Sequence, residues 1–177
     1  MNKEWSELNK TMQAQIKKKD TYKMGIDTLL NLRSQLMQTL VSFKEELCRE
    51  DFNSIPFINA DGYHSKTIAY SIWHIFRIED IVAHTVINED EQVFFAGNYQ
   101  ERINSPIITT GNELIKQQIA DFSKQLNLEE LYSYIFEVRE STEKMLERLS
   151  YDELKRKIPE ERKGYLESLN VVNDNEK

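Results

Sequence analysis

The chain has 177 residues, with 30 acidic against 23 basic side chains and a formal net charge of −7 at neutral pH. This balance argues against a nucleic-acid-binding domain, which usually has a basic excess on one face. Cys48 is the only cysteine, so an intrachain disulfide is excluded. No apolar signal region follows Met1, and no run approaches the roughly 18 to 20 apolar residues of a membrane span. We predict one cytoplasmic domain over residues 1–177, with no membrane and no nucleic-acid partner.

Five glycines and three prolines leave little material for hairpins or glycine-rich phosphate loops. The sequence contains no P-loop, no dinucleotide-binding glycine motif and no GxSxG, which removes the usual nucleotide and serine-hydrolase interpretations. No segment alternates polar and apolar residues over a useful length, so we expect no sheet. The expected fold class is all-α.

Two helical patterns occupy the first 50 residues. Residues 3–17 space apolar side chains at helical intervals, which predicts an amphipathic helix that covers the outside of a bundle within residues 1–20. A longer helix is expected from about Thr21 to about Arg49, and Gly25 weakens its first turn by up to about 1 kcal/mol. Its apolar face is formed by Ile26, Leu29, Leu32, Leu36, Leu40, Phe43 and Leu47.

A connection should follow from Asp51 to Tyr63, because the helical period is lost there and Pro56 and Asp61-Gly62 interrupt it. Its apolar residues should lie over the end of the bundle; they are Phe52, Ile55, Phe57 and Ile58. The next helix, from His64 to Asn88 with Ser65 as N-cap, is apolar on nearly every face, Ile75 included. Such a helix is buried between others, so its central polar residues need an explanation.

Residues 89–110 form a long connection whose Val93-Phe94-Phe95 and Ile107-Ile108 should pack inward. Thr110-Gly-Asn-Glu113 has the side chains of a capping box and predicts a helix to about Gln125. Asn127 offers a cap for the helix 128–149, whose apolar residues alternate steps of three and four. The remaining residues, 150–177, should form two short helices, about 150–157 and 159–169, and a frayed tail.

Three histidines invite a metal interpretation, but His64, His74 and His84 are each ten residues apart. Ten residues advance a helix by about 15 Å and leave side chains about 80° from alignment, so one ion cannot bridge two of them on this helix. From the residues alone, a core His74 bonded to a carbonyl or carboxylate is favoured over a metal ligand. Arg77 is expected in a structural ion pair with Asp80, three residues on.

Cys48 lies near the end of its helix beside Arg49, where a thiol of low pKa is conceivable. No histidine lies within eight residues on either side. An inert, partly buried thiol is therefore the favoured interpretation.

The segment HSKTIAYSIWHIFRIEDIVAH resembles the second helix of the DinB-like (DinB/YfiT) superfamily, and the likeness extends in order and spacing over about residues 3–170. The resemblance implies an up-down-down-up four-helix bundle with a three-histidine metal centre. His74 matches the ligand from the second helix, and the other two come from an HxxxH on the fourth. Some members are transferases or isomerases that use a low-molecular-weight thiol.

The sequence stops at Lys177, where that fourth helix and its HxxxH would begin. The expectation is therefore a bundle whose fourth core helix is missing or replaced, with His74 as one ligand of an incomplete site for a divalent metal such as Zn²⁺ or Ni²⁺. Catalytic and thiol-binding residues stay unassigned. The alternative is a non-catalytic helical protein whose exposed groove mediates self-association. We expect a homodimer in either case, with a seam near Leu131, Ile135, Val138 and Met145.

Overall fold

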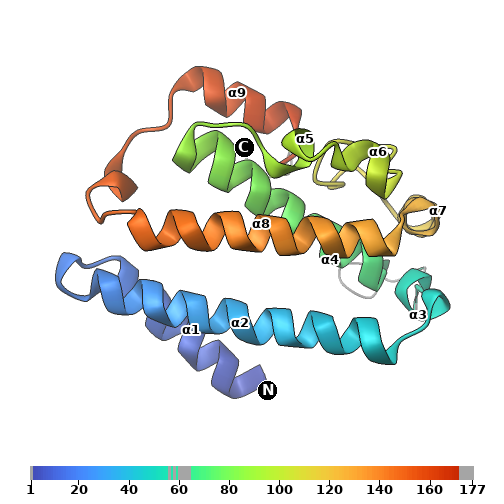
Figure 1. Cartoon of the computed structure of the whole chain (residues 1–177), viewed down its shortest axis with the longest axis horizontal. Coiled ribbons are helices and arrows are strands. Elements are labelled where there is room, and N and C mark those ends of the chain that lie inside the picture. The colour runs from blue at the N-terminus through green and yellow to red at the C-terminus, as the bar shows by residue number, and fades with distance from the viewer. Residues whose placement is uncertain (1, 56, 58, 60–64, 172–177) are drawn as a thin grey trace. The chain divides into compact units, whose positions relative to one another are not determined.

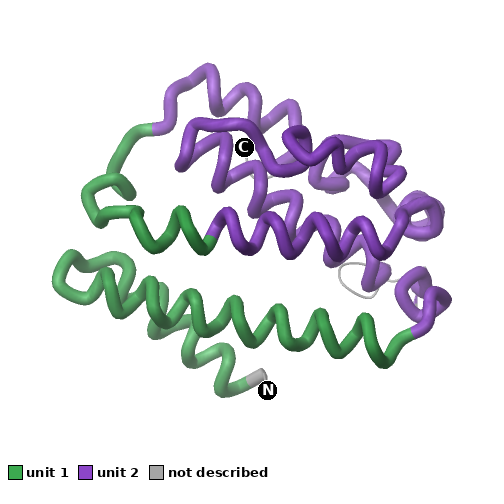
Figure 2. Tube along the Cα trace, in the orientation of Figure 1, with its two compact units in different colours: residues 1–47, 143–157 green, residues 48–142, 158–177 purple. Residues whose placement is uncertain are grey.

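The computed structural model describes residues 2–55, 57, 59 and 65–171, and all regular structure within these residues is helical. The predicted all-α fold class is therefore confirmed, and no strand occurs in that part of the chain. The chain forms two compact units, coloured separately in Figure 2. Unit 1 comprises Met1–Leu47 and Glu143–Lys157, and unit 2 comprises Cys48–Thr142 and Ile158–Lys177. None of the described helices is long and apolar enough to cross a membrane.

Unit 1 is built on the helical hairpin of α1 (Asn2–Ile16) and α2 (Tyr22–Glu46), joined by the short helix η1 (Lys19–Thr21) (Figure 1). The two helices approach closely because Gly25 has no side chain: a Cβ there would lie 2.7 Å from Cγ1 of Ile16. The Tyr22 hydroxyl donates to the carbonyl of Leu149 at 2.9 Å, which ties α2 to the later segment of the unit. The predicted covering helix is thus present as α1, and it packs on α2 within unit 1.

The second predicted helix ends earlier than expected. Leu47 is extended, and a separate helix α3 (Arg49–Asn53) follows in unit 2. The backbone N–H of Cys48 donates to the Asp51 carboxylate at 2.9 Å, which caps α3. The Cys48 side chain is exposed rather than partly buried, and its hydrogen bond to Asp51 raises the pKa of the thiol. The inert interpretation of this cysteine therefore agrees with its surroundings, although its predicted burial is wrong.

Unit 2 is organised around Trp73, whose ring packs edge-on against those of Phe94 and Phe122, both at centroid distances of 5.5 Å. Tyr134 closes the cluster at 6.4 Å from Trp73. These rings come from separate helices, and such burial supplies most of the stabilisation of a small core. Besides α3, the described helices of the unit are α4 (Ile68–Asp80), the π-helix η3 (Ile81–Asn88), α5 (Val93–Ala96), α6 (Tyr99–Ile103), α7 (Gln117–Gln125), α9 (Glu160–Ser168) and most of α8 (Leu128–Arg148).

The helix predicted from His64 to Asn88 differs in three respects. It begins at Ile68, where the N-cap is Thr67 rather than Ser65: the Thr67 hydroxyl accepts from the N–H of Tyr70 at 2.9 Å. It changes to π-helical geometry at Ile81 and stops at Glu89, which has a left-handed φ of 63°. Ile75 is 45 % exposed instead of buried. His64, Ile58, Pro56 and the Asp61-Gly62 pair lie outside the described residues.

The capping box predicted at Thr110 does not open a helix. The Thr110 hydroxyl donates to the carbonyl of Asn170 at 2.5 Å, while Glu113 accepts from Thr109. Helix α7 begins only at Gln117, after Lys116 in a positive-φ conformation. A contact distant in sequence has therefore replaced the local cap. Val93 and Phe94 pack inward as predicted, whereas Phe95 and Ile108 are each 37 % exposed.

Helix α8 matches its prediction, and the Asn127 side chain accepts from the N–H of Glu129 at 3.1 Å. The residues expected at a seam between two copies, Leu131, Ile135, Val138 and Met145, are at most 2 % exposed within the single chain. These four residues therefore form no exposed groove. The homodimer stays a prediction, and this set of residues does not supply its interface. The expected helix 150–157 is reduced to η4 (Glu153–Lys155).

The tail predicted to be frayed is held in place where it begins. Leu169 is buried, and its carbonyl accepts from the N–H of Thr110 at 3.1 Å. Asn170 also accepts from the Asn112 amide at 2.7 Å. Residues 169–170 thus anchor α9 to the loop before α7, and residues 172–177 lie outside the described part.

Candidate functional site

His74 lies on α4, half-buried, with its ring stacked on that of Tyr70 at a centroid distance of 5.6 Å and an angle of 11°. Its Nδ1 is 2.9 Å from the carbonyl oxygen of Thr110. A carbonyl can only accept, so Nδ1 carries the proton and Nε2 keeps its lone pair in the neutral ring. The predicted bond between His74 and a carbonyl is therefore present.

The same bond bears on the metal interpretation. Histidines that bind metals usually donate their other ring N–H to a carbonyl or carboxylate, which fixes the tautomer and the ring orientation. His74 meets this requirement. Among the residues that the structure describes, however, no group of three or more His, Cys, Asp or Glu side chains could hold an ion. The donor chemistry of His74 fits one ligand position of a metal site, and the described residues do not complete the set.

Arg77 lies one turn further along α4 and is completely buried. Its Nε donates to the carbonyl of Ile108 at 2.9 Å, Nη2 to Oε1 of Gln92 at 2.7 Å and Nη1 to Asp80 at 3.3 Å. The guanidinium also lies 4.4 Å from the centroid of the Phe94 ring. The predicted Arg77–Asp80 ion pair is present. Gln92, which we did not identify from the sequence, is a further hydrogen-bond partner of the guanidinium.

Asp80 connects this ion pair to the core. Its carboxylate accepts from the N–H groups of Val93 and Phe94 at 2.9 and 3.0 Å, and from the Tyr134 hydroxyl at 2.8 Å. It therefore caps the start of α5 from a neighbouring helix. Burial raises the pKa of Asp80, and the nearby Arg77 opposes that rise. Burial raises the pKa of Tyr134 well above its usual value, and the charge of Asp80 adds to the effect.

His84 lies in η3 with both ring nitrogens in contact with polar groups. Nδ1 is 2.5 Å from Oδ1 of Asp90, and Nε2 is 3.0 Å from the hydroxyl of Ser141. These pairwise distances resemble those of a serine nucleophile with its base and orienting acid. Ser141 is inside α8, however, where the backbone N–H groups bond within the helix and cannot form an oxyanion hole. We assign this chain of contacts a structural role that joins η3 to α8.

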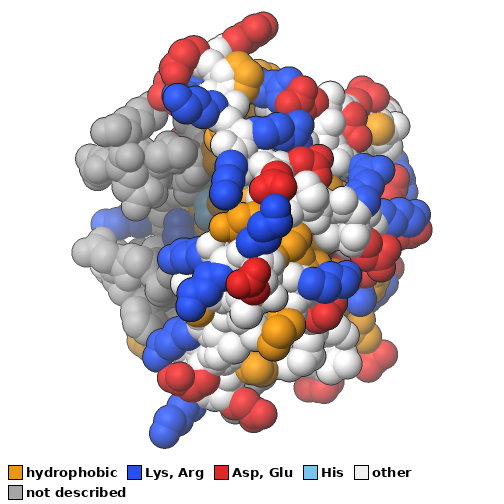
Figure 3. All heavy atoms as spheres, turned by 90° about the vertical axis from the view of Figure 1, so that its left-hand side faces the viewer, with side chains coloured by type: hydrophobic (Ala, Val, Ile, Leu, Met, Phe, Trp, Pro, Cys, Tyr) orange, Lys and Arg blue, Asp and Glu red, His pale blue; other side chains and the backbone are white. Residues whose placement is uncertain are grey.

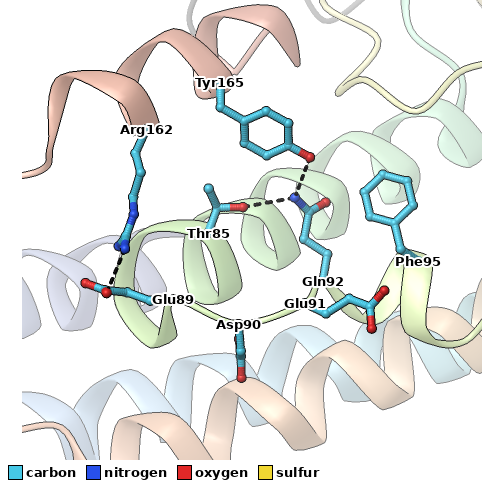
Figure 4. Close-up of a pocket in the computed structure, with 8 residues that line it drawn as sticks. All are labelled: Thr85, Glu89, Asp90, Glu91, Gln92, Phe95, Arg162 and Tyr165. Carbon is cyan, nitrogen blue, oxygen red and sulfur yellow. Dashed lines mark hydrogen bonds and ion pairs between the residues drawn. The ribbon is translucent and has the colours of Figure 1, made fainter.

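A cavity of about 320 Å³ lies beside the end of η3, between the segment that follows it and α9 (Figure 4). It is lined by Thr85, Glu89, Asp90, Glu91, Gln92, Phe95, Arg162 and Tyr165. The sequence predicted none of these as site residues, since they match no motif and two of them come from a helix about 70 residues further along the chain. The only local signal was a glutamine directly before the inward-facing Val93 and Phe94.

Both basic and acidic side chains lie across the face shown in Figure 3. None of the protein families, characterised proteins or solved structures with which we compared the chain matches it.

Proposed function

We propose that the chain is a DinB-like helical protein related to metal- and thiol-dependent transferases or isomerases, in which His74 supplies one ligand to a weakly held divalent metal such as Zn²⁺ or Ni²⁺. The observation that supports this proposal is the hydrogen bond from Nδ1 of His74 to the Thr110 carbonyl at 2.9 Å. It leaves Nε2 as the ring's lone-pair donor in a half-buried position.

Each of the neighbouring residues has a part in holding this donor. The Thr110 carbonyl sets the tautomer, and Tyr70 restricts the ring by stacking on it. Tyr70 is itself fixed, because its hydroxyl donates to the carbonyl of Gly111 at 2.9 Å. A bound divalent metal would supply Lewis acidity toward a thiol or a substrate oxygen. Its other ligands would come from a second copy of the chain or from solvent.

The test is a calorimetric titration of the protein, purified without a metal-affinity tag, with Ni²⁺ or Zn²⁺. We expect weak binding, because one histidine is a poor chelator, and we expect His74→Ala to abolish it. His84→Asn is the matched control, since both ring nitrogens of His84 already contact Asp90 and Ser141. A tightly held, stoichiometric metal that survives His74→Ala would show that other residues are the ligands.

A further inference from the structure

We propose that the cavity beside η3 binds a small organic cation, such as an alkylammonium group. Its volume of about 320 Å³ is within the range of small-molecule sites. The proposal rests on residues 85–95 and α9, and it does not depend on a metal at His74. Three properties of the lining support it: a preformed floor, an excess of negative charge and two accessible aromatic rings.

The floor of the cavity is held in place by buried groups. Gln92 is 3 % exposed, and its Oε1 accepts from the buried Arg77 at 2.7 Å. Its Nε2 donates to the Thr85 hydroxyl at 2.9 Å and contacts the Tyr165 hydroxyl at 3.4 Å, as the dashed lines in Figure 4 show. The side-chain amide therefore has little freedom to rearrange. A ligand would meet a wall that is already formed, which reduces the entropic cost of binding.

The charges of the lining favour a cation over an anion. Arg162, the only basic side chain among the described residues of the lining, is paired with Glu89 at 2.6 Å, so its charge is already neutralised. Asp90 contacts His84. Glu91 is exposed, and it forms no hydrogen bond or ion pair with another residue that the structure describes. The lining thus carries a carboxylate that its own neighbours do not neutralise, and an anionic ligand would meet repulsion there.

Aromatic rings supply the second element of cation recognition. Phe95 and Tyr165 are 37 % and 42 % exposed, and both line the cavity. Figure 4 shows the Glu91 carboxylate on the same side of the cavity as the Phe95 ring, with the Tyr165 ring above. Ring faces attract ammonium groups through their quadrupoles, and a nearby carboxylate adds to that attraction. The adjoining π-helix is also a geometry that often marks functional sites.

The experiment uses three probes of similar size and different charge: tetramethylammonium, tert-butanol and pivalate. Each is titrated into the ¹⁵N-labelled protein, and binding is followed in the amide signals of residues 85–95 and the side-chain amide of Gln92. We expect tetramethylammonium to bind in preference to both other probes. Glu91→Gln and Phe95→Leu should each weaken its binding by about two- to fivefold, the effect of losing one exposed cation contact.

Glu161→Gln is the matched control. Like Glu91→Gln, it removes one carboxylate charge, but Glu161 lies on α9 and does not line the cavity. It should leave the affinity unchanged. Circular dichroism of each variant separates loss of binding from loss of folding. The proposal is overturned if tert-butanol or pivalate binds as well as the cation, or if Glu91→Gln has no more effect than Glu161→Gln. Neither result would bear on the metal proposed at His74.

Discussion

At the scale of single residues, the buried polar groups of α4 explain why an apolar helix tolerates charge in its middle. Arg77 and Asp80 are both buried, but each charge has partners on other elements of unit 2. The spacing of three residues was enough to predict their ion pair. It could not predict Gln92, because that contact depends on how the chain returns after η3.

This network gives a prediction for stability. Arg77→Met should lower the free energy of unfolding by about 3 to 5 kcal/mol, because it leaves Asp80 as an uncompensated buried charge. Adding Asp80→Asn should cost less than the sum of the two single changes, since the second removes the charge that the first exposed. Urea denaturation of the single and double variants measures both effects. Strict additivity would mean that the two residues do not act as a pair.

At the scale of helices, local signals succeeded where the contacts were local. The Asn127 cap and the apolar steps of α8 lie within one segment, and the sequence predicted both. The cap at Thr110 failed because its hydroxyl bonds to Asn170, 60 residues away. The π-helix η3 could not be predicted either: its residues are apolar on nearly every face, so a change of helical period leaves no mark in the pattern.

Two glycines in helices should respond oppositely to the same change. Gly25→Ala should destabilise the protein by about 1 to 3 kcal/mol, because the new Cβ would lie 2.7 Å from Ile16 Cγ1 and 2.8 Å from its backbone nitrogen. Gly164→Ala in α9 should stabilise by up to about 1 kcal/mol, because nothing lies within 4 Å of its Cβ position. Thermal unfolding of both variants tests the pair. A stabilising Gly25→Ala would contradict the close packing of α1 on α2.

At the scale of the whole molecule, the chain passes between the two compact units three times, and α8 continues through one of these passages. We therefore keep the prediction of one cooperative domain. Trp5 reports on unit 1 and Trp73 on unit 2. Unfolding followed by Trp73 fluorescence in a Trp5→Phe variant should coincide with unfolding followed by far-ultraviolet circular dichroism. Two separated transitions would show that the units are independent domains.

Of the two candidate sites, the sequence pointed to His74 and not to the cavity. His74 was identified because it matches a position of the family that the chain resembles. A carbonyl was one of the two kinds of partner predicted for its ring. The cavity was not foreseen, since Glu91, Gln92 and Tyr165 are brought together only by the turn after η3 and the anchoring of α9 at Leu169 and Asn170. Such a site has no signature along the chain.

For the metal proposed at His74, the decisive measurement is the tautomer of this histidine in the intact protein, because a neutral ring protonated at Nδ1 leaves the Nε2 lone pair for the ion. A long-range ¹H–¹⁵N spectrum of the imidazole rings, recorded slightly above neutral pH, distinguishes the two nitrogens. We expect His74 to be protonated at Nδ1, which bonds to the Thr110 carbonyl, and we expect added Zn²⁺ to shift its Nε2 signal while leaving the His84 signals unchanged. A proton on Nε2 of His74, or an Nε2 signal that Zn²⁺ does not shift, would exclude His74 as the metal ligand.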